Sequence, residues 1–162
     1  MGLYALGSLS LSDSTITVDA KGNWGIYAGA GIDISGGKIN SQTDTGYALC
    51  SKSGITYPTE THRITLPENG KFSQVTDGEG ESATTYYTIT ESDGTTAASH
   101  VVIERIGDIN RDGEVNALDL MLLRKYLVEL PIEGTFDEAA ADLNGDNVID
   151  ILDLVRLRKV LA

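Results

Sequence analysis

The chain has 162 residues, enough for one mid-sized domain or two small ones. It has 12 Lys and Arg against 24 Asp and Glu, a formal net charge of −12, so a nucleic-acid backbone would be repelled. No apolar run reaches the roughly eighteen residues that a membrane span needs. The single cysteine, Cys50, excludes an internal disulfide and a thiolate metal cluster made by one chain. No nucleic-acid partner and no membrane span are therefore expected.

The composition changes near residue 107. Residues 1–107 hold 15 of the 18 glycines and 15 of the 16 threonines, whereas residues 108–162 hold 11 of the 17 leucines. Short β-branched runs separated by glycine fill the first part without helical periodicity, which predicts an all-β structure. These runs lie at residues 16–18, 32–34, 55–57, 64–66, 86–89 and 101–103.

A weak repeat occurs within the β part. Gly-Ile-Tyr-Ala at 25–28 resembles Gly-Tyr-Ala-Leu at 46–49, an alignment at a spacing of 21, and repeats of about 20 residues are typical of solenoids. Residues 9–57 resemble the glycine- and isoleucine-rich rungs of bacterial surface β-helix proteins. We therefore expect a fragment of a parallel β-solenoid over residues 1–60 and a separate small β module over 61–106. Because two rungs bury little core, a longer solenoid is expected before Leu3, with Met1-Gly2 as an expression start.

Little in the β part suggests catalysis. His62 and His100 lie far apart in the sequence, with no cysteine or carboxylate at a metal or triad spacing. Four aromatic residues predict either a face that stacks on sugars or stacking within the core, and both alternatives stay open. They are Trp24, Tyr27, Tyr47 and Tyr57. No catalytic residue is predicted, and the chain is not expected to be an enzyme.

The most specific pattern lies in residues 108–162, where oxygen-bearing side chains occupy positions 1, 3, 5, 9 and 12 of two loops that begin at Asp108 and Asp142. Calcium takes about six to eight hard oxygens, and a twelve-residue loop supplies them at this spacing together with the backbone carbonyl of position 7. Position 6 needs a positive φ, which Gly113 adopts freely and Asn147 tolerates. The alternative, a pair of solvated acidic turns, is disfavoured because the pattern occurs twice in register.

Two calcium ions are therefore the expected cofactor. The expected ligands in the first loop are Asp108, Asn110, Asp112, the Glu114 carbonyl, Asn116 and Asp119. Those in the second loop are Asp142, Asn144, Asp146, the Val148 carbonyl, Asp150 and Asp153.

Each of these units is a loop with an exiting helix only. Position 12 is Asp instead of the Glu of an EF-hand, and residues 101–104 before the first loop are typical of a strand. Residues 107–127 and 141–161 resemble a type I dockerin, which would fill the third expected domain, residues 107–162. The resemblance implies an all-α fold of two calcium-binding loop–helix (F-hand) repeats that folds on calcium and binds a cohesin of a scaffoldin. It also implies a secreted parent protein anchored in an extracellular, cell-surface cellulosome that degrades polysaccharide.

The sequence predicts two apolar faces on each of the two helices. At 100° per residue, one stripe of each helix suits the core. Those stripes are Leu120, Leu123, Leu127 and Leu130, and Leu154, Leu157 and Leu161. The opposite stripes are Leu118, Met121, Leu122 and Tyr126, and Ile151, Leu152, Val155 and Val160. Because a small domain has one interior, the second face either meets a partner or packs on the β module.

The resemblance adds loop positions 10 and 11 and the basic residues of each helix as cohesin contacts. Apolar pairs at positions 10 and 11, where many clostridial dockerins have hydroxyl pairs, imply a different cohesin class. The near-identity of the two repeats suggests binding in either of two orientations. The expected partner-binding residues are Ala117, Leu118, Met121, Leu122, Arg124, Lys125, Ile151, Leu152, Val155, Arg158 and Lys159.

Other classes of function stay open. A calcium sensor is disfavoured because its opening needs a helix on each side of the loop. The β part could be a carbohydrate-binding or enzyme-derived fragment with the dockerin as an accessory, which would make polysaccharide a partner through the parent protein. The helical part could also be a calcium-stabilised structural domain.

Overall fold

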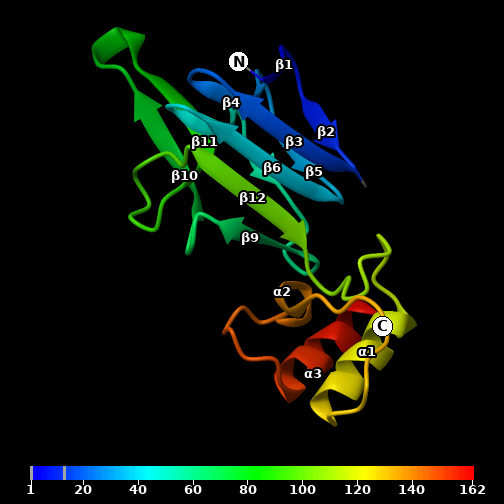
Figure 1. The fold of residues 1–162 in the computed structure, drawn as a ribbon. Coiled ribbons are helices and arrows are strands. Elements are labelled where there is room, and N and C mark those ends of the chain that lie inside the picture. The colour runs from blue at the N-terminus through cyan, green and yellow to red at the C-terminus, as the bar shows by residue number, and fades with distance from the viewer. Residues whose placement is uncertain (1, 13) are drawn as a thin grey trace. The chain divides into compact units, whose positions relative to one another are not determined.

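The computed structural model describes residues 2–12 and 14–162, and the chain divides into two compact units, Met1–Glu104 and Arg105–Ala162. We call them the β unit and the helical unit, and each is described by itself. Strands make up the first and α-helices the second (Figure 1). Among the described residues, no helix is both long enough and apolar enough to cross a membrane.

The strands of the β unit form three sheets in the described part of the chain. The order in the first sheet is β1 (Leu3–Ala5), β4 (Trp24–Ala28), β7 (Tyr47–Ser51), β11 (Thr84–Thr90) and β10 (Lys71–Asp77). The second has β3 (Thr15–Ala20), β6 (Lys38–Thr43), β12 (His100–Arg105) and β9 (His62–Leu66). The third has β2 (Leu9–Leu11), β5 (Ile32–Ile34) and β8 (Ile55–Thr56). A short 3-10 helix, Gly80–Ser82, lies between β10 and β11.

Parallel pairing repeats at a single spacing. Leu3 pairs with Ile26, and Ile26 pairs with Leu49, so partners lie 23 positions apart in the sequence. The parallel strands of the other two sheets have the same spacing of 23. The alignment of residues 25–28 with 46–49 at a spacing of 21 is therefore wrong by two positions, because Tyr47 pairs with Trp24.

One core joins the three sheets. Ile26 of β4, Ile32 of β5 and Ile39 of β6 are buried in a single cluster. The same cluster contains Ile89 of β11 and Ile103 of β12, which come from residues 61–106. Both of these strands extend existing sheets, since β11 pairs antiparallel with β7 and β12 with β6. The separate module expected over 61–106 is thus corrected: its apolar strands complete the sheets and core of the same β unit as residues 1–60.

The turn before β7 gives a prediction about stability. Gly46 has φ +88, and a Cβ there would lie 2.6 Å from the backbone oxygen of Asn23. We expect Gly46→Ala to lower the free energy of unfolding by about 2–3 kcal/mol, because left-handed strain and a backbone clash add. Gly94→Ala is the matched control, with φ +74 and no atom within 4 Å of a new Cβ; it should cost only about 1 kcal/mol. If urea denaturation shows that the two variants lower the free energy of unfolding equally, the close approach of Gly46 to the Asn23 backbone does not contribute to stability.

The helical unit contains α1 (Ala117–Leu127), α2 (Glu138–Ala141) and α3 (Ile151–Val160). The short helix α2 has Asp137 as its N-cap. Helices α1 and α3 contact each other. The core repeats with the sequence, because Ile109 and Leu143, and likewise Leu123 and Leu157, are buried at equivalent positions of the two repeats.

The inward face of α1 differs from the predicted stripe. Leu122, expected to contact a partner, is only 7 % exposed and lies in the core. The reason is Asp119, which lies on the same side of α1 and whose carboxylate accepts a hydrogen bond from the backbone N–H of Ile109 at 2.7 Å. That bond turns the face of Asp119 and Leu122 inward.

Two residues of the predicted core stripes are exposed. Leu130 is 55 % exposed and Leu161 is 36 % exposed. Both lie beyond the last residue of their helix, and Glu129 adopts φ 56, which ends α1 before Leu130. The helical periodicity of 100° per residue, from which the stripes were predicted, therefore does not apply to these two residues.

Candidate functional site: two acidic loops and an exposed helix surface

The two acidic loops share an unusual backbone. In the first, Arg111 has φ 59 and Gly113 has φ 92, at loop positions 4 and 6; in the second, Gly145 has φ 78 and Asn147 has φ 64 at the same positions. The positive φ predicted at position 6 is confirmed in both loops. The positive φ at position 4 was not predicted. The glycine at 145 was the available signal, since glycine favours this region of backbone conformation.

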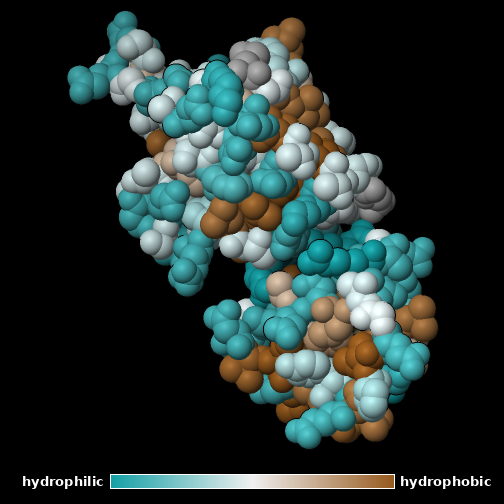
Figure 2. Space-filling view, viewed as in Figure 1, coloured by the Kyte–Doolittle hydropathy of each residue, from teal (hydrophilic) through white to brown (hydrophobic). Residues whose placement is uncertain are grey.

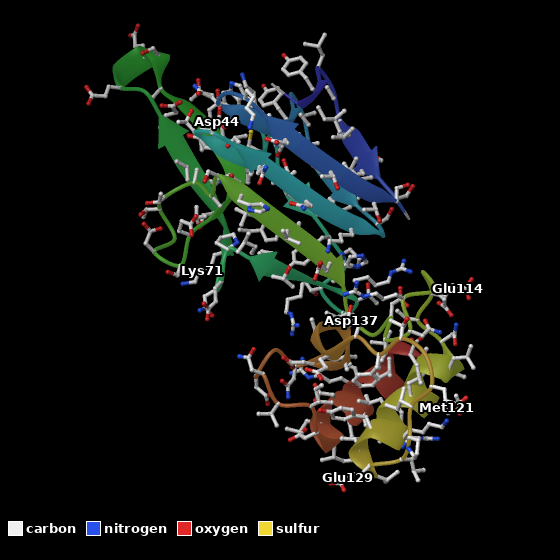
Figure 3. The ribbon with its side chains drawn as sticks, viewed as in Figure 1. Asp44, Lys71, Glu114, Met121, Glu129 and Asp137 are labelled. Carbon is white, nitrogen blue, oxygen red and sulfur yellow. The ribbon has the colours of Figure 1, made fainter. Side chains whose placement is uncertain are left out.

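Side-chain oxygens organise the first loop. The carboxylate of Asp108 accepts hydrogen bonds from the backbone N–H groups of Asp112 and Gly113 at 3.1 and 3.0 Å. Asn110 Oδ1 accepts from the same Asp112 N–H at 2.9 Å, and Asp112 Oδ1 accepts from the N–H of Glu114 at 2.9 Å. The loop backbone thus winds around the oxygens at positions 1, 3 and 5. Glu114 lies on this loop ahead of α1 (Figure 3).

The second loop repeats this arrangement. The carboxylate of Asp142 accepts from the N–H of Asn147 at 3.1 Å. Asn144 Oδ1 accepts from the N–H of Asp146 at 2.8 Å, and Asp146 Oδ1 accepts from the N–H of Val148 at 2.9 Å. Loop positions 1, 3 and 5 therefore have the same hydrogen-bonding role in both copies.

The aspartate at position 12 ties each loop closed. Asp119 is fully buried, and its Oδ1 accepts from the N–H groups of Ile109 and Asn110 at 2.7 and 3.1 Å, while Oδ2 accepts from the N–H of Asn116 at 2.8 Å. Asp153, also fully buried, bonds its own loop in the same way. Burying a carboxylate is costly unless its oxygens are hydrogen-bonded. These bonds join the start of each loop to the start of the following helix.

Position 9 begins each helix. Asn116 Oδ1 accepts from the N–H of Leu118 at 2.7 Å, and Asp150 Oδ1 accepts from the N–H of Leu152 at 2.7 Å. Together with the aspartate at position 12, each forms a capping box. The conformation of the loop therefore fixes where α1 and α3 begin.

The electrostatics of the first loop favour a cation. Burial raises the pKa of Asp108 above its ordinary value, and the negative charges of Asp119 and Asp112 raise it further. The N–H of Glu114 and the amide of Asn110 lower the pKa of Asp112. The carboxylates of Asp112 and Asp119 thus act electrostatically on that of Asp108.

The carboxylates do not form a metal-holding group by themselves. Within residues 2–12 and 14–162, no three Asp, Glu, His or Cys side chains are arranged to hold a metal ion. A cation in the first loop would therefore also need the neutral oxygens that the sequence places there, the amide of Asn110 and the backbone carbonyl of Glu114. These are the hard oxygen donors that calcium prefers.

An ion pair joins the first loop to α2. Arg111 Nε donates to Asp137 Oδ2 at 2.7 Å, and Asp137 Oδ1 accepts from the N–H groups of Ala139 and Ala140. We expect Asp137→Ala to destabilise the helical unit by about 1–2 kcal/mol through loss of the cap. Arg111→Ala should cost less than about 1 kcal/mol, because its side chain is largely exposed.

Chemical denaturation of the helical unit in calcium measures both effects. Asp137→Asn is the matched control, since it keeps a cap acceptor and removes the charge. A cost for Arg111→Ala as large as that for Asp137→Ala would contradict this ordering.

Apolar side chains cover the outer surface of α1 and α3. Leu118 and Met121 of α1 are about half exposed, as are Ile151, Leu152 and Val155 of α3. Met121 projects from α1 in Figure 3, and Figure 2 shows hydrophobic surface over the helical unit. Five of the predicted partner-binding residues are thus exposed apolar side chains on the two repeated helices.

A groove of about 670 Å³ lies between the C-terminal half of α1 and the start of α3. Its apolar lining is rimmed by Arg124 and Lys125. The residues that line it include Met121, Val128, Leu130, Ile151 and Leu154.

The remaining predicted contacts lie on the same two helices. Ala117, Arg158 and Lys159 are exposed. Leu122 is the exception, because it is buried. The equivalent residue of the second repeat is Arg156, which is exposed. Val128 and Leu130 were not predicted to contact a partner, but they join the surface because α1 ends before them.

Comparison with known proteins identifies relatives of the helical unit. The family model described as the dockerin type I domain matches residues 106–162. Among solved structures, a chain from the crystal structure of a CaDoc0917 variant in complex with CaCohA2 at pH 5.5 is 39% identical. The match covers 35% of this chain and 92% of that chain, with a TM-score of 0.33. No match was found among the curated proteins.

Proposed function

Residues 106–162 are a type I dockerin domain, and from that premise we propose that the chain is a calcium-dependent assembly module that binds a cohesin. The observation that carries the proposal is the exposed apolar surface of α1 and α3. Leu118 and Leu152 are 52 and 55 % exposed, and both occupy position 11 of their loops. A contiguous apolar patch with a polar rim is typical of a protein–protein interface. The proposed role is assembly, not catalysis.

The basic side chains indicate the charge of the partner. Arg124 and Lys125 on α1 and Arg158 and Lys159 on α3 lie in the last turn of their helices. An apolar patch rimmed by cations fits a cohesin surface with an apolar centre and acidic flanks, because complementary charge steers association and fixes orientation.

Two calcium ions are proposed as the cofactor, one in each loop. The donor set fits, since each loop supplies side-chain oxygens at five positions and winds its backbone around those at positions 1, 3 and 5. A bound ion would supply the positive charge that offsets repulsion among the carboxylates. The proposed ligands are the twelve residues predicted from the sequence, with Asp119 and Asp153 also holding the loop ends through backbone N–H groups.

Binding in two orientations is a further part of the proposal. The two repeats share positive φ values at loop positions 4 and 6, a capping box and exposed side chains at positions 10 and 11. A twofold rotation that exchanges α1 and α3 would present nearly the same side chains to the cohesin. One equivalent position differs in exposure, because Leu122 is buried whereas Arg156 is exposed.

The proposal extends to the β unit and to the location of the protein. We infer that the parallel strands that recur at a spacing of 23 are rungs of a parallel β-solenoid, since three sheets share that spacing. A dockerin would anchor its parent protein in an extracellular cellulosome, which implies secretion.

Binding to a panel of bacterial cohesins, measured with calcium and with EGTA, tests the assembly role. We expect tight binding to one cohesin class that disappears in EGTA. The absence of binding to every cohesin, with two calcium ions bound, would instead favour a calcium-stabilised structural domain.

A further inference from the structure

A second hollow lies within the β unit, where β4 and β7 begin. Its volume is about 390 Å³, within the range of about 300–1,000 Å³ typical of small-molecule sites. Its walls come from the turns before β4 and β7, the end of β10 and the connection between β11 and β12. The lining residues with aromatic or polar side chains are Asn23, Trp24, Thr45, Tyr47, Asp77 and Ser99.

Aromatic side chains form one wall of this pocket. Trp24 and Tyr47 are paired on adjacent parallel strands, and their rings stack with centroids 5.1 Å apart at 11°. Tyr86 of β11 meets Trp24 at 5.1 Å with the rings at 63°. Because each ring is held by its neighbours and by a sheet, the wall is formed before any ligand arrives.

The turns bring polar groups beside that wall. The missing side chain at Gly46 lets its backbone approach the carbonyl of Asn23, and the N–H of Tyr47 donates to that carbonyl at 2.8 Å. Thr45 Oγ1 then donates to Asn23 Oδ1 at 2.8 Å. This bond uses the amide oxygen of Asn23, so its NH2 group can donate to a ligand.

A hydrogen-bond acceptor also lines the pocket. Asp77, at the end of β10, is exposed. Asp77 and Tyr47 both line the pocket, and burial together with the negative charge of Asp77 raises the pKa of Tyr47. A carboxylate can accept hydrogen bonds from two neighbouring hydroxyl groups.

The chemistry of the lining selects one class of ligand. A sugar ring presents C–H groups that pack on aromatic surface and hydroxyls that need both donors and acceptors. Asp77 is the charged residue among those that line the pocket, and the chain has a net charge of −12, so an anionic ligand would be repelled. Trp24 and Tyr47 stack on each other and do not form an open cage for a cation. We propose that this pocket binds a neutral pyranose ring of a polysaccharide.

The chain contains its own reporter for this site. Trp24 is its single tryptophan, so intrinsic fluorescence follows the pocket wall directly. The full chain in calcium is titrated with neutral oligosaccharides of glucose, xylose, mannose and galactose. We expect a saturable change with at least one of them at a Kd below about 1 mM.

Variants separate this site from other surfaces. Asn23→Ala removes the amide that bonds a hydroxyl, and Asp77→Asn replaces one of the two charged acceptor oxygens with an NH2 donor, so each should raise the Kd about tenfold. Glu68→Gln removes the same charge as Asp77→Asn at another exposed turn position of the β unit and should leave the Kd unchanged. Circular dichroism of each variant should match the unmodified chain.

Three results would overturn the proposal: no saturation by any neutral oligosaccharide up to about 10 mM, an equal Kd for Asp77→Asn, or binding of only oligogalacturonate or tetramethylammonium. None of these readouts depends on cohesin, so the proposed assembly role stands or falls separately.

Discussion

Removal of calcium is expected to unfold the helical unit and leave the β unit folded. Without the ions, the acidic loops would keep several carboxylates close together, and those loops set where α1 and α3 begin. A ligand present at a thousandfold excess over its Kd stabilises a folded unit by about 4 kcal/mol. EGTA should therefore abolish most of the far-UV helix signal and lower the thermal midpoint of that unit.

The single tryptophan is the internal control for this experiment. Trp24 lies in the β unit, so its fluorescence should stay constant while the helix signal falls. Added calcium in excess of EGTA should restore the helix signal. A helix signal unchanged in EGTA would contradict the proposed role of calcium in folding.

The double substitution Leu118→Asp with Leu152→Asp is expected to abolish cohesin binding. Each change buries a charge in an apolar contact, which is costly when no partner charge is present. If the dockerin binds in two orientations, either single substitution leaves one intact surface. Each single variant should then bind within about tenfold of the unmodified chain, as measured by calorimetry in calcium.

Leu6→Asp is the matched control, because Leu6 is 83 % exposed in the β unit and should not affect cohesin affinity. A single substitution that removes binding on its own would rule out two orientations. Binding by the double variant would place the cohesin contact elsewhere.

Much of the β unit could be predicted from local sequence, and its pairing could not. The β-branched runs over 32–34, 64–66 and 86–89 all lie on strands. Strand β6, Lys38–Thr43, was not among the predicted runs because polar residues interrupt it. The spacing of 23 was missed because Trp24 and Tyr47 align in space, whereas the glycines that suggested 21 are not equivalent: Gly25 lies within β4 and Gly46 in the turn before β7.

The loops were predicted in greater detail than the helix surface. Ligand spacing is a local property, and the structure gives the two loops equivalent hydrogen bonds. The direction of α1 depends on a longer-range bond, from the N–H of Ile109 to Asp119, which no helical periodicity reveals. That bond buries Leu122, and the early end of α1 exposes Leu130.

The recurrence of one loop–helix design within the helical unit also has a statistical consequence. If both orientations are used, a bound complex has two arrangements of nearly equal energy, which would add an entropic gain of about 0.4 kcal/mol to association. The exchange of Leu122 for Arg156 makes the two arrangements unequal, because one is a buried apolar side chain and the other an exposed cation. The two orientations would then be unequally populated. Ionic strength would shift their ratio, because salt screens the charge of Arg156 and has no such effect on Leu122.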